Sequence, residues 1–552
     1  MSSSLPWDGQ GFDVLVVGGG INGVAIARQL AQERMRVFLV EQNDFGSGAT
    51  SRSTRIIHGG LRYLEQGEIG LVRESLAERE SLMQESPHLI QPREFLLALP
   101  RKPRSLLRTS LAVRTGLWLY QHWAGGHHKP LSDLRNFEAQ LDAGNQWAIY
   151  SYEDAQCEFP ERLVAEWLAE ATSFGAVVRN HTEALEITRS GDRVTGARLR
   201  DRISGQEYAV AARWVINASG PWADAVVKSS GIRGERLIGG IRGSHLVFPK
   251  FTGAPEQAVY AEATDGRQVF ILPWNRQLLV GTTEVLDSDD PGKTEPSPEE
   301  VDYLYESLLR VFPHCGLTKG DIHFSFAGVR PLPYAPGKKY SSITRRHLLH
   351  NHAEDGAAGL ISIIGGKLTT AARLARDVAR MLGLNIPEGH SVLAAPADHE
   401  DVHAVVRQWA HAVAAKAGIR ESCAEGIAEW HGRHALAVAH AASIDERLRA
   451  PICSHSCHLV AEAVEAVAHE SAITLGDILL RRVPVALGGC WSEECSREAA
   501  QKIGAALGWD SSRIGLELEA FEEERRMFLH PGNPRVSSGD VSAPQLPTIE
   551  HA

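Results

Sequence analysis

The sequence has little cysteine, no excess of positive charge and no long apolar run. Seven cysteines in 552 residues are too few for a disulfide framework and fit a reducing, intracellular compartment. The net charge of −11 disfavours a general nucleic-acid-binding protein, whose binding surface is basic. No apolar run reaches the roughly 18–20 residues of a membrane-spanning helix. Residues 1–11 lack the regions of a signal peptide, so we expect none, and any membrane contact is expected to be peripheral.

The most informative segment that is present is a glycine turn near the N-terminus. An apolar run leads into Gly18, Gly20 and Gly23, which have G-x-G-x-x-G spacing, and a second apolar run ends directly before Glu41. This pattern predicts a strand, a turn whose backbone approaches a pyrophosphate, and a helix whose N-terminus faces the anion. The acidic residue can bind ribose hydroxyls. The unit therefore predicts a dinucleotide, without deciding between FAD and NAD.

Two further segments each admit two interpretations. Residues 101–123 mix Arg and Lys with Leu, Trp and Tyr, which is typical of a helix on an anionic membrane surface, and equally of a core helix with a solvated basic face. Residues 453–458 hold two cysteines and two histidines. Their spacing does not match common zinc patterns, and four ligands from six consecutive residues would strain a tetrahedral shell. We therefore expect packing there, and no metal.

An ordered set of motifs resembles the FAD-dependent (quinone-linked, aerobic type) glycerol-3-phosphate dehydrogenases. The motifs run in order from about residue 12 to 385. They are GGGINGVAIA, the block TSRSTRIIHGGLRYLE at 50–65, and then NASGPW, RGSH, ILPW, GTTE, AGVRPL, ITR and IGGKLTT. The helical remainder, with GDILLRR at 476–482, is similar to the C-terminal cap of that family.

The resemblance implies an α/β fold: a glutathione-reductase-like FAD-binding Rossmann domain, an antiparallel-sheet substrate domain and a C-terminal all-helical domain. Residues 1–385 would hold the first two domains. The expected FAD-binding parts are about 12–95, 150–225 and 325–385, and the substrate parts about 96–149 and 226–324. A linker at 386–400, the helical domain at 401–530 and a disordered tail at 531–552 would follow.

The resemblance also implies an activity. FAD would be the cofactor in the oxidation of sn-glycerol 3-phosphate to dihydroxyacetone phosphate, with hydride passing from C2 to flavin N5 and electrons continuing to a membrane quinone. Another polyol phosphate, or oxygen as the acceptor, stays open. An FAD protein acting on RNA is disfavoured by the negative net charge, and a non-catalytic flavin scaffold by the intact His245, Arg330 and Lys367. The implied location is the cytoplasm or the cytoplasmic face of the inner membrane, and a homodimer stays open.

The family's cofactor-binding positions fall on identifiable residues. They are Gly18, Gly20, Asn22, Gly23, Glu41, Thr50, Ser51, Ser53, His58, Gly59, Ala218, Gly220, Trp222, Gly366, Lys367, Leu368 and Thr369. A helix that begins near Gly366 would aim its N-terminus at the N1/C2=O edge of the flavin. Together with Lys367 it would stabilise the negative charge that reduction places there. The alternative is a tight turn that ends a core strand.

A substrate with a dianionic phosphate and two hydroxyls needs fixed cations and a base. The candidates from the matching motifs are Arg62, Tyr63, His245, Arg330, Arg345 and Lys367, with His245, Arg330 and Lys367 as catalytic residues. Arginine offers a planar fork suited to phosphate. His245 is the candidate general base because imidazole titrates nearest to neutral pH. The competing role for His245 is substrate orientation, with a nearby arginine lowering the pKa of the alcohol. Arg242 stands where the family usually has Lys.

Overall fold

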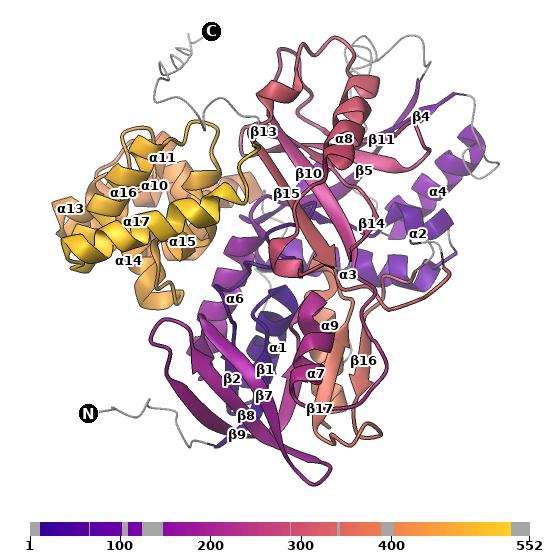
Figure 1. Ribbon diagram of the computed structural model, residues 1–552. Helices are drawn as coiled ribbons and strands as arrows, with labels where there is room; N and C mark the ends of the chain where they lie inside the picture. The colour runs from indigo at the N-terminus through magenta and orange to yellow at the C-terminus, as the bar shows by residue number, and fades with distance from the viewer. Residues whose placement is uncertain are drawn as a thin grey trace.

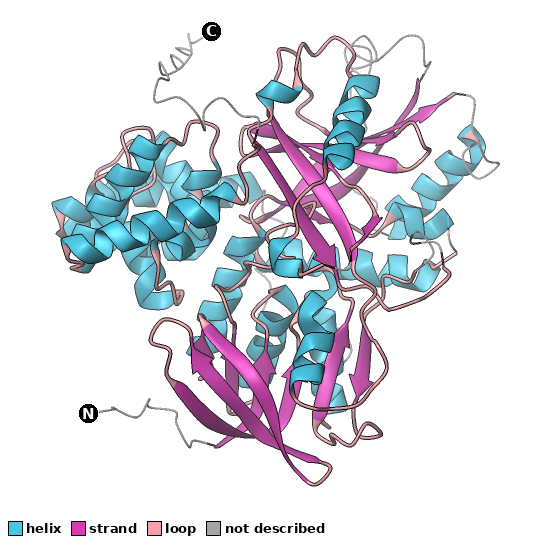
Figure 2. Ribbon diagram, viewed as in Figure 1, coloured by secondary structure: helices cyan, strands magenta, loops and turns pink. Residues whose placement is uncertain are grey.

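Two β-sheets and a group of C-terminal helices make up the described part of the chain (Figure 1; Figure 2). The computed structural model describes residues 11–65, 67–101, 109–123, 147–287, 289–338, 340, 343–387 and 402–531. Almost all of the expected linker at 386–400, nearly all of the expected tail at 531–552, and residues 102–108 of the basic segment lie outside these ranges.

The first sheet has the strand order β16-β17-β9-β1-β2-β6, and its central strands are parallel. Along β1, Val14 and Val16 pack against helices α1, α6 and α9 on one face, while Leu15 and Val17 pack toward β7, β8 and α7 on the other. Burial on both faces explains why β1 is an apolar run without polar alternation. This is the doubly covered nucleotide-binding sheet that the glycine turn predicted.

The elements of this first part have the following bounds. The strands are β1 (Gly11–Val17), β2 (Val37–Val40), β6 (Val177–Arg179), β7 (Thr182–Ser190), β8 (Arg193–Asp201), β9 (Glu207–Asn217), β16 (Leu348–Asn351) and β17 (Leu360–Ile364). The helices are α1 (Ile21–Gln32), α6 (Pro160–Ser173), α7 (Ala223–Ser229) and α9 (Ala371–Met381), with short 3₁₀ turns at Gly220–Trp222 and Leu368–Thr370.

The second sheet has the order β14-β10-β13-β12-β11-β4-β5-β3, with β15 beside β10. Among the described strands its pairings are antiparallel except that between β4 and β11. One face is covered by α8, which begins with a capping box between Ser297 and Glu300. The other face is covered by α3 and α4 and by apolar side chains of the C-terminal helices. Phe95 and Leu97 point to this second core and Leu96 to the α8 side, as strand periodicity requires.

The elements of this second part are bounded as follows. The strands are β3 (Ile56–Ile57), β4 (Ile90–Pro100), β5 (Trp147–Cys157), β10 (Ile241–Pro249), β11 (Ala258–Glu262), β12 (Gln268–Trp274), β13 (Gln277–Gly281), β14 (Val285–Leu286) and β15 (Phe324–Arg330). The helices are α2 (Leu61–Glu65), α3 (Ile69–Glu85), α4 (Ser110–Trp123) and α8 (Pro298–Val311), with 3₁₀ turns at Pro291–Lys293 and Lys319–Asp321. Residues 90–95, 150–157 and 325–330, which were expected in the FAD-binding part, belong to this sheet. The first two segments belong to it because β4 and β5 pair without a break, and the third because β15 pairs with β10.

The C-terminal region is helical, and it is continuous with the rest of the molecule. Helices α10, α11 and α12 enclose a core of their own, whereas α14, α16 and the turns around 475–487 share a core with the second sheet. A disulfide bond, which the spacing of the cysteines did not predict, joins Cys423 of α11 to Cys457. No helix of the described residues is both long enough and apolar enough to cross a membrane.

The elements of the helical region complete the chain. They are α10 (Val402–Ala417), α11 (Glu421–His431), a 3₁₀ turn (Gly432–His434), α12 (Ala435–Ile444), α13 (Glu446–Arg449), α14 (Val460–His469), α15 (Leu475–Asp477), a π-helical turn (Ile478–Arg482), a 3₁₀ turn (Val485–Leu487), α16 (Glu493–Leu507) and α17 (Ser511–Arg526).

Candidate active site

A cavity of about 860 Å³ lies where the two sheets meet. Its walls come from the turn after β1, the end of β2, the turn after β9 and strands β10 and β15. The cavity therefore begins at the carboxyl ends of the parallel strands, where open α/β sheets bind their ligands. Its volume lies in the upper part of the usual range for ligand pockets, roughly 300–1,000 Å³.

The first glycine turn has the geometry that its spacing predicts. Gly18 has a φ of +105°, and a Cβ there would lie 2.6 Å from the carbonyl oxygen of Ala218. A Cβ at Gly23 would lie 1.8 Å from the carbonyl oxygen of Gly18, so this glycine allows α1 to pack on β1. Gly20 and Asn22 line the cavity. The N-terminus of α1 therefore forms part of the wall, where it can stabilise a pyrophosphate.

Glu41, at the end of β2, is held in place by two backbone N–H groups. Its carboxylate oxygens accept hydrogen bonds from the N–H of Gly19 at 2.7 Å and from the N–H of Asn43 at 3.0 Å. Burial raises the pKa of Glu41. The carboxylate lines the cavity beside the N-terminus of α1, which is the position expected for binding ribose hydroxyls.

The polar loop that follows β2 supports the same wall. The hydroxyl oxygen of Thr50 accepts a hydrogen bond from the N–H of Ile21 at 3.1 Å, which ties the loop to the first turn of α1. Ser53 lines the cavity, whereas Ser51 donates its hydroxyl to the carbonyl oxygens of Ser47 and Gly48 and lies behind the wall.

A second glycine turn forms another part of the cavity wall. Gly365 and Gly366 have φ angles of +77° and +92°, and a Cβ at Gly366 would lie 2.4 Å from Nδ2 of Asn22. That amide donates to the carbonyl oxygen of Gly365 at 3.4 Å, so the two glycine turns are in direct contact. The chain then forms the 3₁₀ turn and α9. Thr369 Oγ1 accepts a hydrogen bond from the N–H of His58 at 3.2 Å.

Most of the residues expected to hold the cofactor line this one cavity. They are Gly18, Gly20, Asn22, Glu41, Thr50, Ser53, His58, Ala218, Gly220, Trp222, Gly366, Lys367, Leu368 and Thr369. The structure places Gly23, Ser51 and Gly59 behind the wall. A Cβ at Gly59 would lie 2.6 Å from the hydroxyl of Tyr120. The two glycines allow the backbone to pack closely there, and Ser51 holds the polar loop by hydrogen bonds.

Arg330 and His245 belong to the paired strands β15 and β10, whose register places Arg330 opposite Ile241 and His245 opposite Phe326. The Arg330 guanidinium donates to Thr282 Oγ1 at 2.8 Å and to the carbonyl oxygen of Thr283 at 3.2 Å. A Cβ at Gly243 would lie 2.3 Å from Nη2 of Arg330, so the glycine provides the space in which the guanidinium lies.

His245 is buried and electrically neutral at neutral pH. Its Nε2 lies 3.0 Å from Thr54 Oγ1, and its ring stacks on Phe326 with 5.2 Å between centroids. Its Nδ1 has no hydrogen-bond partner in the described part of the chain. Burial, with the charges of Arg330 and Arg55, lowers the pKa of His245 well below 6.5. The imidazole is thus in the form that can accept a proton.

Lys367 follows the second glycine turn and lies over Tyr63, with 4.2 Å from Nζ to the ring centroid. Its ammonium group donates to Ser75 Oγ at 3.3 Å. Burial lowers the pKa of Lys367 to about 7, and the nearby carboxylates of Glu74 and Glu68 offset this only in part. Both Lys367 and Tyr63 line the cavity, as expected.

Arg345 also lines the cavity, and Nη2 of its guanidinium lies 2.9 Å from Glu284 Oε1. Its Nη1 is buried and meets no hydrogen-bond acceptor among the residues that the structure describes. The side chain of Arg62 is not among them, so its expected role in substrate binding stays a prediction. Arg242 instead pairs with Glu300 at 2.9 Å and Asp287 at 3.4 Å, outside the cavity wall.

Sequence reasoning missed the polar side chains that hold these groups. Thr54 and Thr282 touch His245 and Arg330, and Ser75 touches Lys367. Two of them lie inside motifs that were recognised, TSRSTR and GTTE, where their hydroxyls were the available signal. Ser75 lies within α3, and no local pattern distinguishes it.

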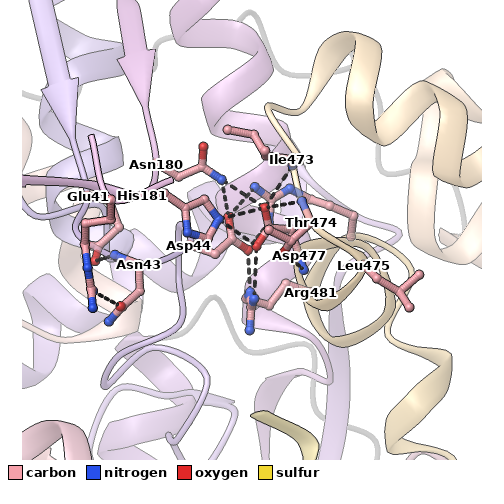
Figure 3. Close-up of polar contacts among 12 residues, drawn as sticks. Glu41, Asn43, Asp44, Asn180, His181, Ile473, Thr474, Leu475, Asp477 and Arg481 are labelled. Atoms are coloured by element: carbon pink, nitrogen blue, oxygen red, sulfur yellow. Dashed lines mark hydrogen bonds and ion pairs between the residues drawn. The ribbon is translucent and has the colours of Figure 1, made fainter. Parts of the chain in front are cut away.

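The helical region reaches the adenosine end of the cavity through a buried ionic cluster around Asp44, three residues after Glu41 (Figure 3). Asn180 Nδ2 donates to Asp44 at 2.9 Å and to Asp477 at 3.1 Å, and Arg481 forms an ion pair with Asp44. Hydrogen bonding from His181 and the charges of the two arginines hold the pKa of Asp477 below its usual range, against the opposing effect of burial. The side chains of Arg481, Glu524 and Met527 also line the cavity.

A parallel sheet with a phosphate-binding turn, a second glycine turn and a second sheet carrying cations and a neutral imidazole define the class of flavin-dependent oxidoreductases. The donors fit FAD: Glu41 and the N-terminus of α1 suit its ADP half, and the turn at Gly366 has no room for a Cβ.

Comparison with known proteins agrees with this class. The model of the FAD dependent oxidoreductase family matches residues 13–372, and that of the C-terminal domain of alpha-glycerophosphate oxidase matches 397–514. A glycerol-3-phosphate dehydrogenase from Synechocystis sp. is 40% identical over 385 residues, covering 66% of this chain and 69% of the relative. Glycerol-3-phosphate dehydrogenase 2 of Mycobacterium tuberculosis (strain H37Rv) is 32% identical over 533 residues, covering 92% and 87%.

Among solved structures, the glycerol-3-phosphate dehydrogenase from Bacillus halodurans complexed with FAD has the same fold, with a TM-score of 0.75 over 95% of this chain and 96% of that one, at 24% identity. The chain belongs to the FAD-dependent glycerol-3-phosphate dehydrogenase family. The resemblance, the α/β fold with its helical C-terminal domain, and FAD as the cofactor are thereby confirmed.

Proposed function

We propose that this protein oxidises sn-glycerol 3-phosphate to dihydroxyacetone phosphate. The observation that carries the proposal is that Arg330, Arg345 and Lys367 line the same cavity as the groups that suit ADP. These basic side chains, together with a buried neutral histidine on which the charge of Arg330 acts, match a small dianion with an oxidisable alcohol. Arg345 has a buried guanidinium nitrogen available to a phosphate oxygen.

FAD, when bound, supplies the two-electron acceptor for the hydride that leaves C2. The residues of the chain bind and orient the substrate and manage the hydroxyl proton. Arg330 is pre-oriented by Thr282 and Thr283, so its fork loses little freedom on meeting a phosphate. Charge-assisted contacts of this kind contribute about 1.5–3 kcal/mol each.

His245 is the group that receives the hydroxyl proton. Its ring is oriented by Thr54 and Phe326, and it is unprotonated before substrate binds. An arriving phosphate dianion adds negative charge nearby and raises the affinity of the imidazole for a proton. In the competing role, His245 only orients the substrate. His245→Asn separates the two: loss of a base lowers kcat by roughly 10²–10⁴-fold, whereas an orienting amide would preserve most of the rate.

We infer that the electrons continue to a membrane quinone from a protein bound peripherally. The support is α4, on which Leu111 and Trp118 are 78% and 63% exposed, one on either side of the exposed Arg114. Large apolar side chains beside a basic one on a helix face suit an anionic membrane surface. The same helix buries Leu117 and Tyr120, so it is anchored in the second core.

The test of function is anaerobic bleaching of the flavin absorbance by a panel of polyol phosphates. Glycerol 3-phosphate is expected to bleach the flavin of the purified protein, and glycerol without phosphate to fail. Faster bleaching by a longer polyol phosphate would show that this compound is the substrate, and the proposed oxidation chemistry would still hold. Absence of visible flavin absorbance after FAD soaking would contradict the cofactor itself. Oxygen consumption during turnover would favour an oxidase over a quinone-linked enzyme.

A further inference from the structure

A cluster of metal-binding side chains lies in the helical region, away from the cavity. Cys453 and His455 belong to the loop between α13 and α14, and Cys495 is the third residue of α16. Their ligand atoms, two Sγ and one imidazole nitrogen, all lie within 4.8 Å of one another, and Nδ1 of His455 is 3.3 Å from Sγ of Cys495. The loop and the helix are 40 residues apart in sequence at this contact.

The other two metal-ligand candidates of the loop are already engaged. Cys457 is in the disulfide bond with Cys423. His458 directs Nδ1 to Glu462 at 3.0 Å and stacks on Trp430. The strain argument against four ligands from 453–458 therefore holds for that set, but the structure assembles a different one.

The groups around the cluster suit a cation that is held by thiolate ligands. Cys495 lies in the first turn of α16, whose positive end stabilises a negative charge. Glu498 adds a negative charge next to the cluster, and its carboxylate accepts a hydrogen bond from the N–H of Ser454 at 2.8 Å, which fixes the loop.

We propose that Cys453, His455 and Cys495 bind one Zn²⁺ ion, with water in the fourth position. Zinc takes thiolate at about 2.3 Å and imidazole at about 2.0–2.1 Å, so a tetrahedron places sulfur and nitrogen about 3.6 Å apart. The 3.3 Å separation of Nδ1 and Sγ is close to that edge. The two cysteines are buried and His455 is exposed, which leaves the fourth position toward solvent.

Such an ion would join the loop to α16, in addition to the disulfide that joins it to α11. The loop would then be held to two helices by two independent links. Soft thiolate ligands select zinc over magnesium or calcium, so the site would not exchange with those ions.

The test uses the full-length flavoprotein, with its Cys423–Cys457 disulfide intact, after exposure to Zn²⁺ and gel filtration. Elemental analysis is expected to give one zinc per chain, and Co²⁺ in its place to give the absorption bands of tetrahedral thiolate coordination. Cys453→Ser, Cys495→Ser and His455→Ala should each lose both signals, while Cys490→Ser, at an exposed cysteine outside the cluster, keeps them.

Flavin content and circular dichroism report whether the variants fold, and His455→Ala, at an exposed position, keeps the test valid if the buried variants fail. The proposal is overturned if the parent takes up neither ion stoichiometrically, if His455→Ala binds as the parent does, or if peptide mapping finds Cys453 disulfide-bonded to Cys495.

Discussion

Arg482 donates to both carboxylate oxygens of Asp44, at 2.7 Å and 2.9 Å, across 438 residues of sequence. Both side chains are fully buried. Asp44 follows Glu41, the residue expected to bind ribose, by three residues, and Arg482 belongs to the helical region. The pair therefore connects the C-terminal helices to the loop that shapes the adenosine end of the cavity.

Asp44→Asn leaves Arg481 and Arg482 without their shared carboxylate. Removing one partner of a buried ion pair costs about 3–5 kcal/mol. We expect faster FAD release and a lower melting temperature, measured by flavin fluorescence and calorimetry. Glu256→Gln, which breaks the exposed pair with Lys250, is the control and should change neither. Unchanged FAD release in Asp44→Asn would show that the cluster does not stabilise the loop.

Gly366→Ala tests the contact between the two glycine turns. Gly366 and Gly383 have nearly the same φ, +92° and +89°, but a Cβ meets Asn22 at the first and nothing within 4 Å at the second. Both substitutions carry the backbone penalty of a positive φ, about 1–3 kcal/mol. Only Gly366→Ala should also weaken FAD binding, as measured by titration of the apoprotein. Equal FAD affinity in the two variants would remove this turn from the cofactor site.

Arg330→Ala should raise KM for glycerol 3-phosphate by roughly 10–150-fold, the equivalent of about 1.5–3 kcal/mol. Gly243→Ala is the sharper companion, because it keeps the charge and moves the guanidinium: its Cβ would lie 2.3 Å from Nη2. It should raise KM in the same direction. Lys228→Ala, at an exposed lysine, serves as the control in steady-state kinetics. If both site variants have the same KM as the parent within error, the substrate phosphate binds elsewhere.

Lys367 predicts a pH dependence in substrate binding. Its pKa of about 7 means that the group is protonated below pH 7 and neutral above it in the substrate-free protein. We therefore expect KM to rise as the pH increases through 7, since the cation for the dianionic phosphate is lost. Lys367→Arg keeps its charge throughout and should flatten this limb. A parent profile that is flat between pH 6 and 8.5 would contradict the assignment.

The exposed face of α4 predicts binding to anionic vesicles. Arg101→Glu/Arg114→Glu, which reverses one charge on α4 and one directly after β4, should weaken sedimentation with phosphatidylglycerol vesicles, because each basic residue near the surface contributes about 1 kcal/mol. Arg193→Glu/Arg233→Glu, at exposed arginines of the first sheet region, changes net charge equally and is the control. Equal sedimentation of the two double variants would count against membrane contact through α4.

The local sequence predicted the cofactor-binding half of the site well. A G-x-G-x-x-G turn is read from neighbouring residues, and Gly18 and Glu41 lie where the pattern put them. The substrate-binding half was predicted only through the family resemblance, because His245 and Arg330 are brought into one site by the pairing of β10 with β15. The contacts between distant segments had no local signal: Asp44 with Arg482, Asn22 with Gly365, and Cys453 with Cys495. Contacts between residues that are far apart in the chain cannot be predicted from the local patterns of a single sequence.

The presence of Arg481, Glu524 and Met527 in the cavity wall has a consequence for synthesis. The residues at the N-terminal end of this wall leave the ribosome first, and Met527 leaves some 500 residues later. A nascent chain that has made both sheets still lacks part of the wall. We therefore expect full retention of the cofactor to wait for α17, and a messenger truncated before α17 to yield a polypeptide that releases its flavin.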